Sequence, residues 1–428
     1  MNKFVCLYNF KIFICLLLIK MALDISYHYF VAELYAYSGM ELDYSGERLS
    51  LSYFITSLFI YYLLIFKNKI ATFFVLVLFI FLFLPIQTLW VFGGGSSVFF
   101  AQVCFGLTLI LIFSQIHEVR FFSVKQGNSL LVLILTSMLI LYVALVGAKG
   151  AYKLISFDFS DMYENRELLF EQVFHGFFGY FASWVGKVVL PLLLAIALWR
   201  KSYILAIAIF AVSILNYGLV QRKEFLMFPI IVCYFYFVYH SKPNAIGKFS
   251  SVILLFLTIA LSSYVVTENS IIAGVIFHRL FFVVAQNHFE YFNFFQSNPL
   301  VFLSNSIFSS FVDYPYNDKI PTLIGFGRFS EGQDSFANTG LFASAYMHFG
   351  GLGVVVYSVL TGTILSVYNS LVKQGAPTFM VYALGFISVF QLVNGDLTAT
   401  LLTHGMGLGI ILLMLIDKTK PLIRLNFG

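Results

Sequence analysis

Three basic residues that stand beside apolar segments are the first candidates for chemistry in this sequence. Arg222 and Lys223 lie in a short polar stretch between two apolar runs, and Arg279 lies among aromatic residues. An arginine close to membrane hydrocarbon is costly unless it has a partner, and a guanidinium can pair with phosphate oxygens through two parallel hydrogen bonds. These residues are therefore candidates to bind a lipid diphosphate headgroup. The alternative is that their side chains snorkel to water or form ion pairs, for example Lys223 with Glu224.

A second set of residues could move a proton. Asp334 and Asn338 stand where a polar stretch returns to an apolar run, and His404 lies near the expected outer end of the last run. A histidine with a near-neutral pKa can accept the proton of a sugar hydroxyl, and a carboxylate such as Asp334 can act as a general base. The alternatives are structural: Asn338 as the N-cap of the following helix, Asp334 as a solvated loop acid, and His404, like His348, as a packing residue.

The composition indicates which kind of structural element positions these side chains. Hydrophobic residues make up 60% of the 428 residues and charged residues only 11%, which is typical of a chain whose solvent is mostly lipid. All four cysteines lie inside apolar runs without a CxxC spacing, so redox or zinc chemistry is not expected. The Walker, GxSxG and HExxH motifs are also absent from the sequence. We expect no cofactor and no metal.

Apolar runs of membrane-spanning length recur along the whole chain and predict an all-α polytopic membrane protein with about 12 transmembrane helices, forming a single integral membrane domain over residues 1–428. The first run is interpreted as a signal anchor that is retained rather than cleaved. The short connections between the seventh and eighth runs (203–219 and 224–240) and between the last two runs (378–394 and 401–416) predict helical hairpins. The runs are 4–22, 50–66, 70–91, 97–114, 129–147, 178–199, 203–219, 224–240, 249–266, 340–368, 378–394 and 401–416.

The charges predict how the chain is oriented. Lys and Arg concentrate in alternate connections, which are cytoplasmic by the positive-inside rule, and both termini fall on that side. Of the twenty Asp and Glu residues, only Glu118 and Asp417 lie in the cytoplasmic segments. Residues 267–339 then form one large loop on the outer, periplasmic side, between the ninth and tenth spans. Its first part, 271–295, is apolar and aromatic at helical spacing, which predicts a helix on the membrane surface.

Four short stretches of the sequence, 279–283, 291–298, 338–350 and 402–405, resemble the bacterial O-antigen polymerase (Wzy-type) family, the oligosaccharide repeat unit polymerases of surface polysaccharide assembly. The twelve predicted spans, the internal termini and the large loop before the tenth span also match that family. The resemblance implies a glycosyltransferase of the bacterial inner membrane with a GT-C-like fold. Such enzymes transfer a growing glycan from undecaprenyl diphosphate to a new lipid-linked repeat unit at the periplasmic face.

The same resemblance assigns roles to some residues. Arg279 matches the arginine that would hold the donor diphosphate, and Asn338 and Gly340 match the motif at the end of the loop. The related O-antigen ligases carry a histidine near this point, where the present sequence has Ala337-Asn338. The identity of the base is therefore not carried over, and Asp334 and His404 are proposed from their own chemistry. Undecaprenyl-diphosphate-linked glycans, a chain-length regulator and a flippase of the same pathway are the implied partners; nucleic acid is not.

The sequence therefore predicts a site of two parts. Arg279, Asp334, Asn338 and His404 form the catalytic set, and Arg222, Lys223, Tyr291 and Gly340 the substrate-binding set. Stacking of sugar rings on Tyr291, Phe294 and Trp184 is also predicted, although aromatic residues at an interface often serve only as anchors. The alternatives are a flippase or other transporter, and an O-antigen ligase. A transporter is disfavoured because the sequence shows no internal repeat and its polar residues gather at the outer rim rather than at mid-span.

Overall fold

The computed structural model of the protein describes most of the chain, and the regular secondary structure of the described part is helical apart from an isolated β-bridge between Asp43 and Gly93. The chain forms two compact units. Unit 1 comprises Met1–His117, Asn244–Ser366 and Val389–Leu397, and unit 2 comprises Glu118–Pro243, Val367–Ser388 and Thr398–Gly428. The described residues are 3–67, 69–116, 119–121, 124, 126–158, 162–241, 245–306, 309–326 and 336–416.

The expectation of a polytopic, all-helical membrane protein is confirmed. Ten helices of the described chain are long and apolar enough to cross a membrane. Nine of them coincide with predicted runs, and the tenth, Ser270–Ser297, lies inside the predicted outer loop. Two further runs form shorter apolar helices, Glu224–Val238 and Thr378–Asn394. The first run forms α1 (Lys3–Ser26), which carries four charged residues and is not among the ten within the described part of the chain.

Unit 1 is built around one fully buried helical segment, α4 (Ile70–Leu78), η3 (Phe79–Phe83) and α5 (Leu84–Phe92). Its 23 residues are mostly apolar and its whole spanning window is buried, as expected for the central helix of a bundle. The π-helical turn η3 ends directly before Leu84-Pro85. Because proline lacks an N–H and its ring clashes with the preceding turn, an extra residue in that turn relieves the clash.

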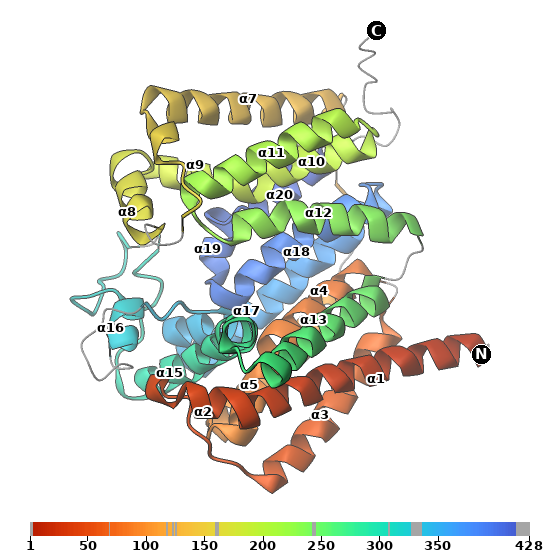
Figure 1. Cartoon of the computed structure of the whole chain (residues 1–428), viewed down its shortest axis with the longest axis vertical. Coiled ribbons are helices and arrows are strands. Elements are labelled where there is room, and N and C mark those ends of the chain that lie inside the picture. Colours follow the sequence, from red (N-terminus) through yellow and green to blue (C-terminus); the bar gives the residue numbers. More distant parts are fainter. Residues whose placement is uncertain are drawn as a thin grey trace. The chain divides into compact units, whose positions relative to one another are not determined.

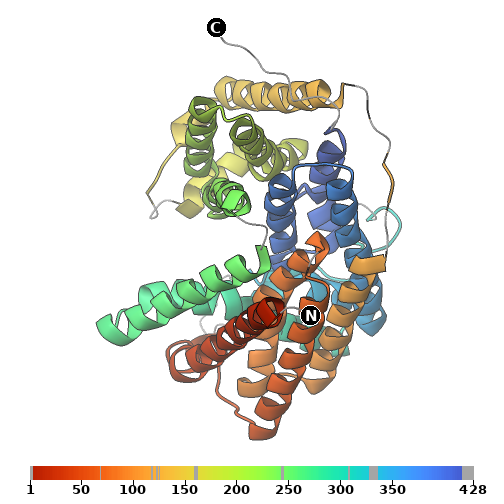
Figure 2. The same cartoon turned by 90° about the vertical axis from the view of Figure 1, so that its right-hand side faces the viewer.

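Other helices of unit 1 pack around this segment. They are α3 (Gly46–Ile65), α6 (Ser97–Ile116), α13 (Ala245–Thr267) and α1, of which α1 and α13 lie side by side in both Figure 1 and Figure 2. Three short elements follow α1 before α3 begins: η1 (Tyr27–Val31), α2 (Ala32–Leu34) and η2 (Ala36–Ser38).

The predicted outer loop begins with a long helix rather than with open chain. Glu268 has a left-handed φ of 54° and ends α13, and the side chain of Asn269 then caps the next helix by accepting from the amide of Ile271. This helix comprises α14 (Ser270–Ala273), η6 (Gly274–Phe282) and α15 (Val283–Ser297). Figure 1 shows α13 along the plane of the view and the start of the following helix nearly end-on, so the chain turns sharply between them.

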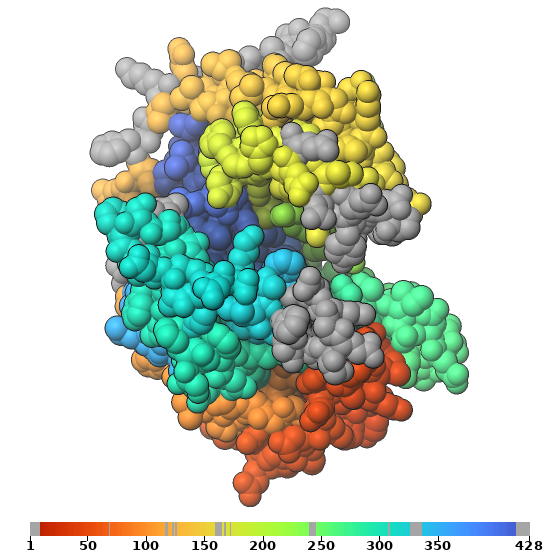
Figure 3. Space-filling model, turned by 90° about the vertical axis from the view of Figure 1, so that its left-hand side faces the viewer, coloured from red at the N-terminus to blue at the C-terminus, as the bar shows by residue number. Residues whose placement is uncertain are grey.

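A helix over 271–295 is therefore confirmed, whereas its place on the membrane surface stays a prediction, and the less regular part of the loop begins only after Ser297. That part contains the short helix α16 (Ile320–Phe326). In Figure 3 this part of the chain, coloured teal, is exposed on the face turned to the viewer. Its inner side packs on a cluster of buried residues that includes Tyr291, Val301 and Ile320.

The loop returns to α17 (Leu341–Lys373), a helix that is broken near its start. Phe349 has φ −140° and ψ 19°, and Gly350 has φ 60° and ψ −147°. The second of these conformations is essentially open only to glycine. The break separates the first two turns of α17, which follow the end of the loop, from the long helical part that continues to Lys373.

Unit 2 contains the remaining helices. The predicted hairpin of α11 (Tyr203–Val220) and α12 (Glu224–Ser241) is confirmed, with Gln221 in a left-handed conformation between them. Both helices pack on α10 (Leu190–Trp199). As in unit 1, a π-helical turn precedes a Leu-Pro pair, here η5 (Val185–Val189). The others are α7 (Gly127–Ala148), η4 (Ala151–Leu154), α8 (Met162–Gln172), α9 (Phe177–Trp184), part of α18 (Thr378–Asn394), α19 (Leu397–Leu402) and α20 (Met406–Met414).

Candidate functional site

Two residues predicted from the sequence, Arg222 and His404, line the same pocket in unit 2. The pocket has a volume of about 320 Å³ and is bounded by the end of α8, by α9, by the turn between α11 and α12, and by the break between α19 and α20. Its volume is at the lower end of the range for small-molecule sites. Aromatic side chains form much of its wall: Phe170, Phe174, Tyr180 and Phe225.

Arg222 supplies a cation to this pocket. Its guanidinium carbon lies 5.2 Å from the centre of the Phe170 ring, within the range of a cation–π contact. Burial lowers the pKa of the Arg222 guanidinium, Glu224 opposes this shift, and Arg166 adds to it. Because an arginine side chain is not deprotonated in proteins, the group still carries its charge at neutral pH. The pocket therefore has a fixed positive charge beside aromatic faces.

A second cation stands close to Arg222. Lys187 lies in the π-helical turn η5 and is 1% exposed, and the charges of Glu224 and Arg222 both act on it. Among the described charges that act on Arg222 and Lys187, Glu224 is acidic and Arg166 is basic. The balance favours an anionic ligand. Lys223, next to Arg222 in the turn, is exposed.

His404 is placed by the break between the last two helices. The amides of Thr403 and His404 both donate to the carbonyl of Ala399 at 2.8 Å, which ends α19, and Gly405 follows with φ 86°. The indole N–H of Trp184 donates to the carbonyl of Leu402 at 2.8 Å and holds the break against α9. His404 was expected at the end of a continuous span, and it lies instead in a turn between two short helices.

The end of the large loop is held in unit 1 by α15. The hydroxyl of Tyr291 donates to the carbonyl of Ala337 at 2.9 Å, and the side-chain amide of Asn287 donates to the carbonyl of Asn338 at 2.6 Å. Gly340 approaches His288 and the carbonyl of Val393 so closely that a Cβ there would collide with both. Tyr291, Asn338 and Gly340 are thus brought together.

The structure differs from two expectations for the end of the large loop. Tyr291 is fully buried, so its ring offers no face to a sugar, and the hydrogen bond to Ala337 gives it a positioning role instead. Asn338 is exposed, and Gly340 rather than Asn338 occupies the N-cap position, because α17 begins at Leu341 and Ser344 donates to the Gly340 carbonyl at 2.9 Å. Asp334 lies outside the described residues.

Arg279 lies in a different part of unit 1, on η6, with an exposed side chain. Its neighbour His278 is buried and stacks on Tyr35, with ring centroids 3.8 Å apart and planes inclined by 10°. Burial raises the pKa of Tyr35, and the positive charge of Arg279 acts in the opposite direction. Arg279 is therefore an accessible cation next to the stacked rings of His278 and Tyr35.

A pair that the sequence analysis did not connect stands at the break in α17. The Nε2 of His348 lies 3.3 Å from Asp396 Oδ2, and the Leu303 amide donates to His348 Nδ1 at 3.1 Å. Since Nδ1 accepts a hydrogen bond, Nε2 carries the proton and faces the carboxylate. The Tyr357 hydroxyl also donates to Asp396, at 3.4 Å. With both ring nitrogens engaged, His348 acts as a structural connector rather than as a base.

Charged residues also occur inside unit 1, contrary to the expectation that polar groups gather at the rim. Lys20 and Asp24 form a buried ion pair on α1. Thr88 on α5 accepts from Lys20 at 3.2 Å and donates to Asp24 at 2.8 Å. The spacing of four residues between Lys20 and Asp24 places both on one face of a helix, a signal that the sequence already contained.

Comparison of the chain with protein-family models, curated proteins and solved structures finds no match. Within the described residues there is no group of three or more His, Cys, Asp or Glu side chains arranged to hold a metal ion.

Proposed function

We propose that this protein is a GT-C-like glycosyltransferase of the bacterial inner membrane that polymerises undecaprenyl-diphosphate-linked oligosaccharide repeat units at the periplasmic face. The observation that carries the proposal is the pocket of unit 2, in which Arg222 and His404 face one space with aromatic walls. A lipid-linked sugar diphosphate matches this pocket. Its diphosphate is an anion that Arg222 can bind, and its sugar has apolar faces that can stack on the aromatic walls. Transfer of the sugar to a hydroxyl releases a proton, which His404 can accept.

In this proposal the acceptor hydroxyl oxygen attacks the anomeric carbon of the donor glycan. The new C–O bond forms as the bond to the lipid diphosphate breaks, and the diphosphate leaves with the bonding electron pair. The transition state has oxocarbenium character, as in other glycosyl transfers. Arg222, with the field of Lys187 behind it, stabilises the negative charge that builds on the leaving diphosphate. His404 accepts the proton of the attacking hydroxyl.

The other predicted residues keep supporting roles in the proposal. Arg279 is exposed on η6, and the family resemblance implies that it holds the donor diphosphate. Tyr291, Asn287 and Gly340 position the end of the loop through the contacts described above. Asp334 is the alternative base to His404.

A transporter of lipid-linked glycans is the second candidate function, and the buried group of Lys20, Asp24 and Thr88 favours it. Ionisable residues within a helical bundle of a membrane protein often mark the path of an ion or a proton. The two functions differ in where the glycan accumulates. Loss of a polymerase leaves single repeat units on the acceptor lipid, whereas loss of a flippase strands repeat units on the cytoplasmic side.

The test is elongation of purified lipid-linked repeat units by the purified protein in nanodiscs. Removing one preorganised donor from a developing negative charge typically lowers kcat by about 100-fold to 1,000-fold, so Arg222→Ala should lose activity to that extent. Arg222→Lys should retain part of it, because the charge remains but the paired hydrogen bonds do not. Arg200→Gln is the matched control, since Arg200 caps α10 and does not line the pocket.

His404→Ala and Arg279→Ala complete the series. The proposal expects both to slow chain growth while the protein remains folded, with Asp334→Asn as the comparison for the identity of the base. Wild-type rates for Arg222→Ala would remove the pocket from the mechanism. Wild-type rates for Arg279→Ala would remove only its role with the leaving group.

A further inference from the structure

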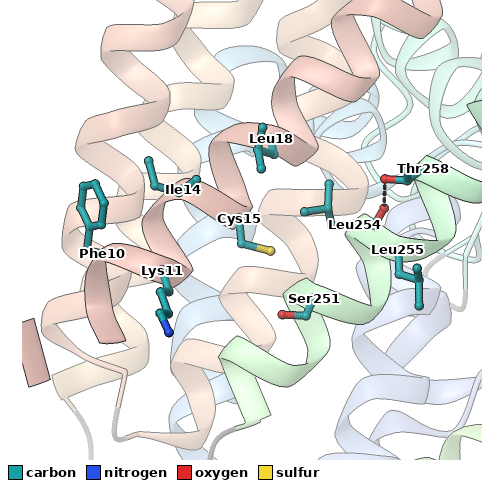
Figure 4. Close-up of a pocket in the computed structure, with 9 residues that line it drawn as sticks. All are labelled: Phe10, Lys11, Ile14, Cys15, Leu18, Ser251, Leu254, Leu255 and Thr258. Atoms are coloured by element: carbon teal, nitrogen blue, oxygen red, sulfur yellow. Dashed lines mark hydrogen bonds between the residues drawn. The ribbon is translucent and has the colours of Figure 1, made fainter. Parts of the chain in front are cut away.

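A groove runs along the surface of unit 1 between α1 and α13. Its volume is about 550 Å³, and apolar side chains from both helices form most of it, among them Ile14, Leu18, Leu254 and Leu255. Figure 4 shows these side chains lining the space between the two helices. α13 is one of the helices long and apolar enough to cross a membrane, so its outward face contacts lipid.

The groove is polar at one end and apolar at the other. Lys11 and Ser251 stand at the same end in Figure 4, and Leu18 and Thr258 stand toward the opposite end. The hydroxyl of Thr258 is turned to its own helix, where it donates to the carbonyl of Leu254 at 2.8 Å. From Lys11 to Leu18 the helix rises by about 10 Å. The groove thus has the polarity of one lipid chain with its headgroup at Lys11.

Further positive charge lies at the polar end. Lys67, which follows α3, donates to the side chain of Asn9 on α1, two residues before Lys11. Lys248 lies on α13 one turn before Ser251. Lys11 lines the groove itself, while Lys67 and Lys248 lie at the same end of α1 and α13, on the side that the charge pattern assigns to the cytoplasm. Basic clusters at the cytoplasmic membrane surface attract anionic lipids.

We propose that the groove between α1 and α13 is a binding site for an anionic glycerophospholipid of the cytoplasmic leaflet, with one acyl chain along Ile14, Leu18 and Leu254 and the phosphate at Lys11. An acyl chain gains little from leaving the bilayer, because lipid tails and leucine side chains are equally apolar. Selectivity therefore comes from the charge at the polar end. This site is independent of the pocket proposed for glycosyl transfer.

The experiment measures lipid binding to the full-length protein by native mass spectrometry. The detergent-purified protein is titrated with phosphatidylglycerol or phosphatidylethanolamine of identical chains. The expected result is one tightly retained phosphatidylglycerol per protein and weaker retention of phosphatidylethanolamine. Lys11→Gln should reduce the preference about fivefold, the size expected for one basic residue beside an anionic membrane surface. The control Lys201→Gln, at an exposed lysine in unit 2, should leave the preference unchanged.

A second variant distinguishes the contribution of the acyl chain to lipid binding from that of the headgroup. Leu254→Trp fills the groove and should weaken retention of both lipids alike, while gel filtration verifies that the protein remains folded. Equal retention of the two lipids by the wild type would overturn the proposal, and so would equal losses in Lys11→Gln and Lys201→Gln. Displacement of phosphatidylglycerol by undecaprenyl phosphate at equal concentration would assign the groove to a polyprenyl lipid instead. A dimer that Leu254→Trp dissociates would assign it to a second copy of the chain.

Discussion

Replacement of Gly350 by alanine should destabilise the protein through the backbone alone. Gly350 has φ 60° and ψ −147° at the break in α17, a conformation that L-residues rarely adopt. Its cost for alanine is about 1–3 kcal/mol. Among the described residues, a Cβ at this position would meet only the Leu300 side chain, at 3.8 Å, which is ordinary van der Waals contact. Crowding therefore adds nothing to the cost.

The matched control is Gly147→Ala in α7. A Cβ there meets no atom of the described chain within 4 Å, and the position is helical. Alanine favours a helix over glycine by up to about 1 kcal/mol, so this variant should be neutral or more stable. The two substitutions add the same methyl group and should change the free energy of unfolding in opposite directions, with a difference of about 1–4 kcal/mol.

The assay is reversible unfolding in mixed micelles at increasing mole fractions of sodium dodecyl sulfate, followed by circular dichroism. Strain at the break should also disturb the contact of His348 with Asp396, so the histidine resonances of Gly350→Ala should shift relative to those of Gly147→Ala. A Gly350→Ala protein as stable as the wild type would refute the reasoning, because the break would then not need glycine.

Two further predictions concern tyrosines of the large loop. Tyr291→Phe removes the hydrogen bond to the buried carbonyl of Ala337 and should lower the free energy of unfolding by about 1–3 kcal/mol in the same assay. The control Tyr316→Phe should cost little, because water replaces its exposed hydrogen bond to Pro299. Equal costs would contradict the assigned difference in burial. Burial raises the pKa of the Tyr314 hydroxyl, so any stability that this shift contributes is present below pH 10 and is lost as pH rises through the folded-state pKa. The difference in phenolate absorbance between wild type and Tyr314→Phe should therefore develop above pH 10 in the folded protein, and a midpoint at or below 10 would contradict this shift.

Much of the fold could be predicted from the sequence because membrane helices are recorded in local composition. The apolar runs place the helices, and the helical spacing in 271–295 correctly predicts a helix there. The positions where a helix breaks depend on contacts with distant parts of the chain. The turn at Thr403–Gly405 divides a run that is apolar on both sides, and composition alone does not reveal it.

The site was only partly predictable for the same reason. Arg222 and His404 stand out by residue type, but they meet in one pocket because helices distant in sequence pack together. Tyr291 was misjudged as a sugar-stacking residue, since an aromatic at helical spacing fits a buried position and an interface equally well. The orientation of the chain and its cytoplasmic termini remain predictions from the positive-inside rule.

The most direct test of the central claim is the stoichiometry of leaving-group release during chain growth. Purified protein in nanodiscs is supplied with a defined undecaprenyl-diphosphate-linked repeat unit, without nucleotide. The glycosidic bonds formed and the free undecaprenyl diphosphate are then counted in the same samples. The account predicts one undecaprenyl diphosphate released for each new bond, at a rate that falls about 100-fold or more in Arg222→Ala. Folded protein that makes no bonds, or bonds without release of the lipid diphosphate, would contradict it.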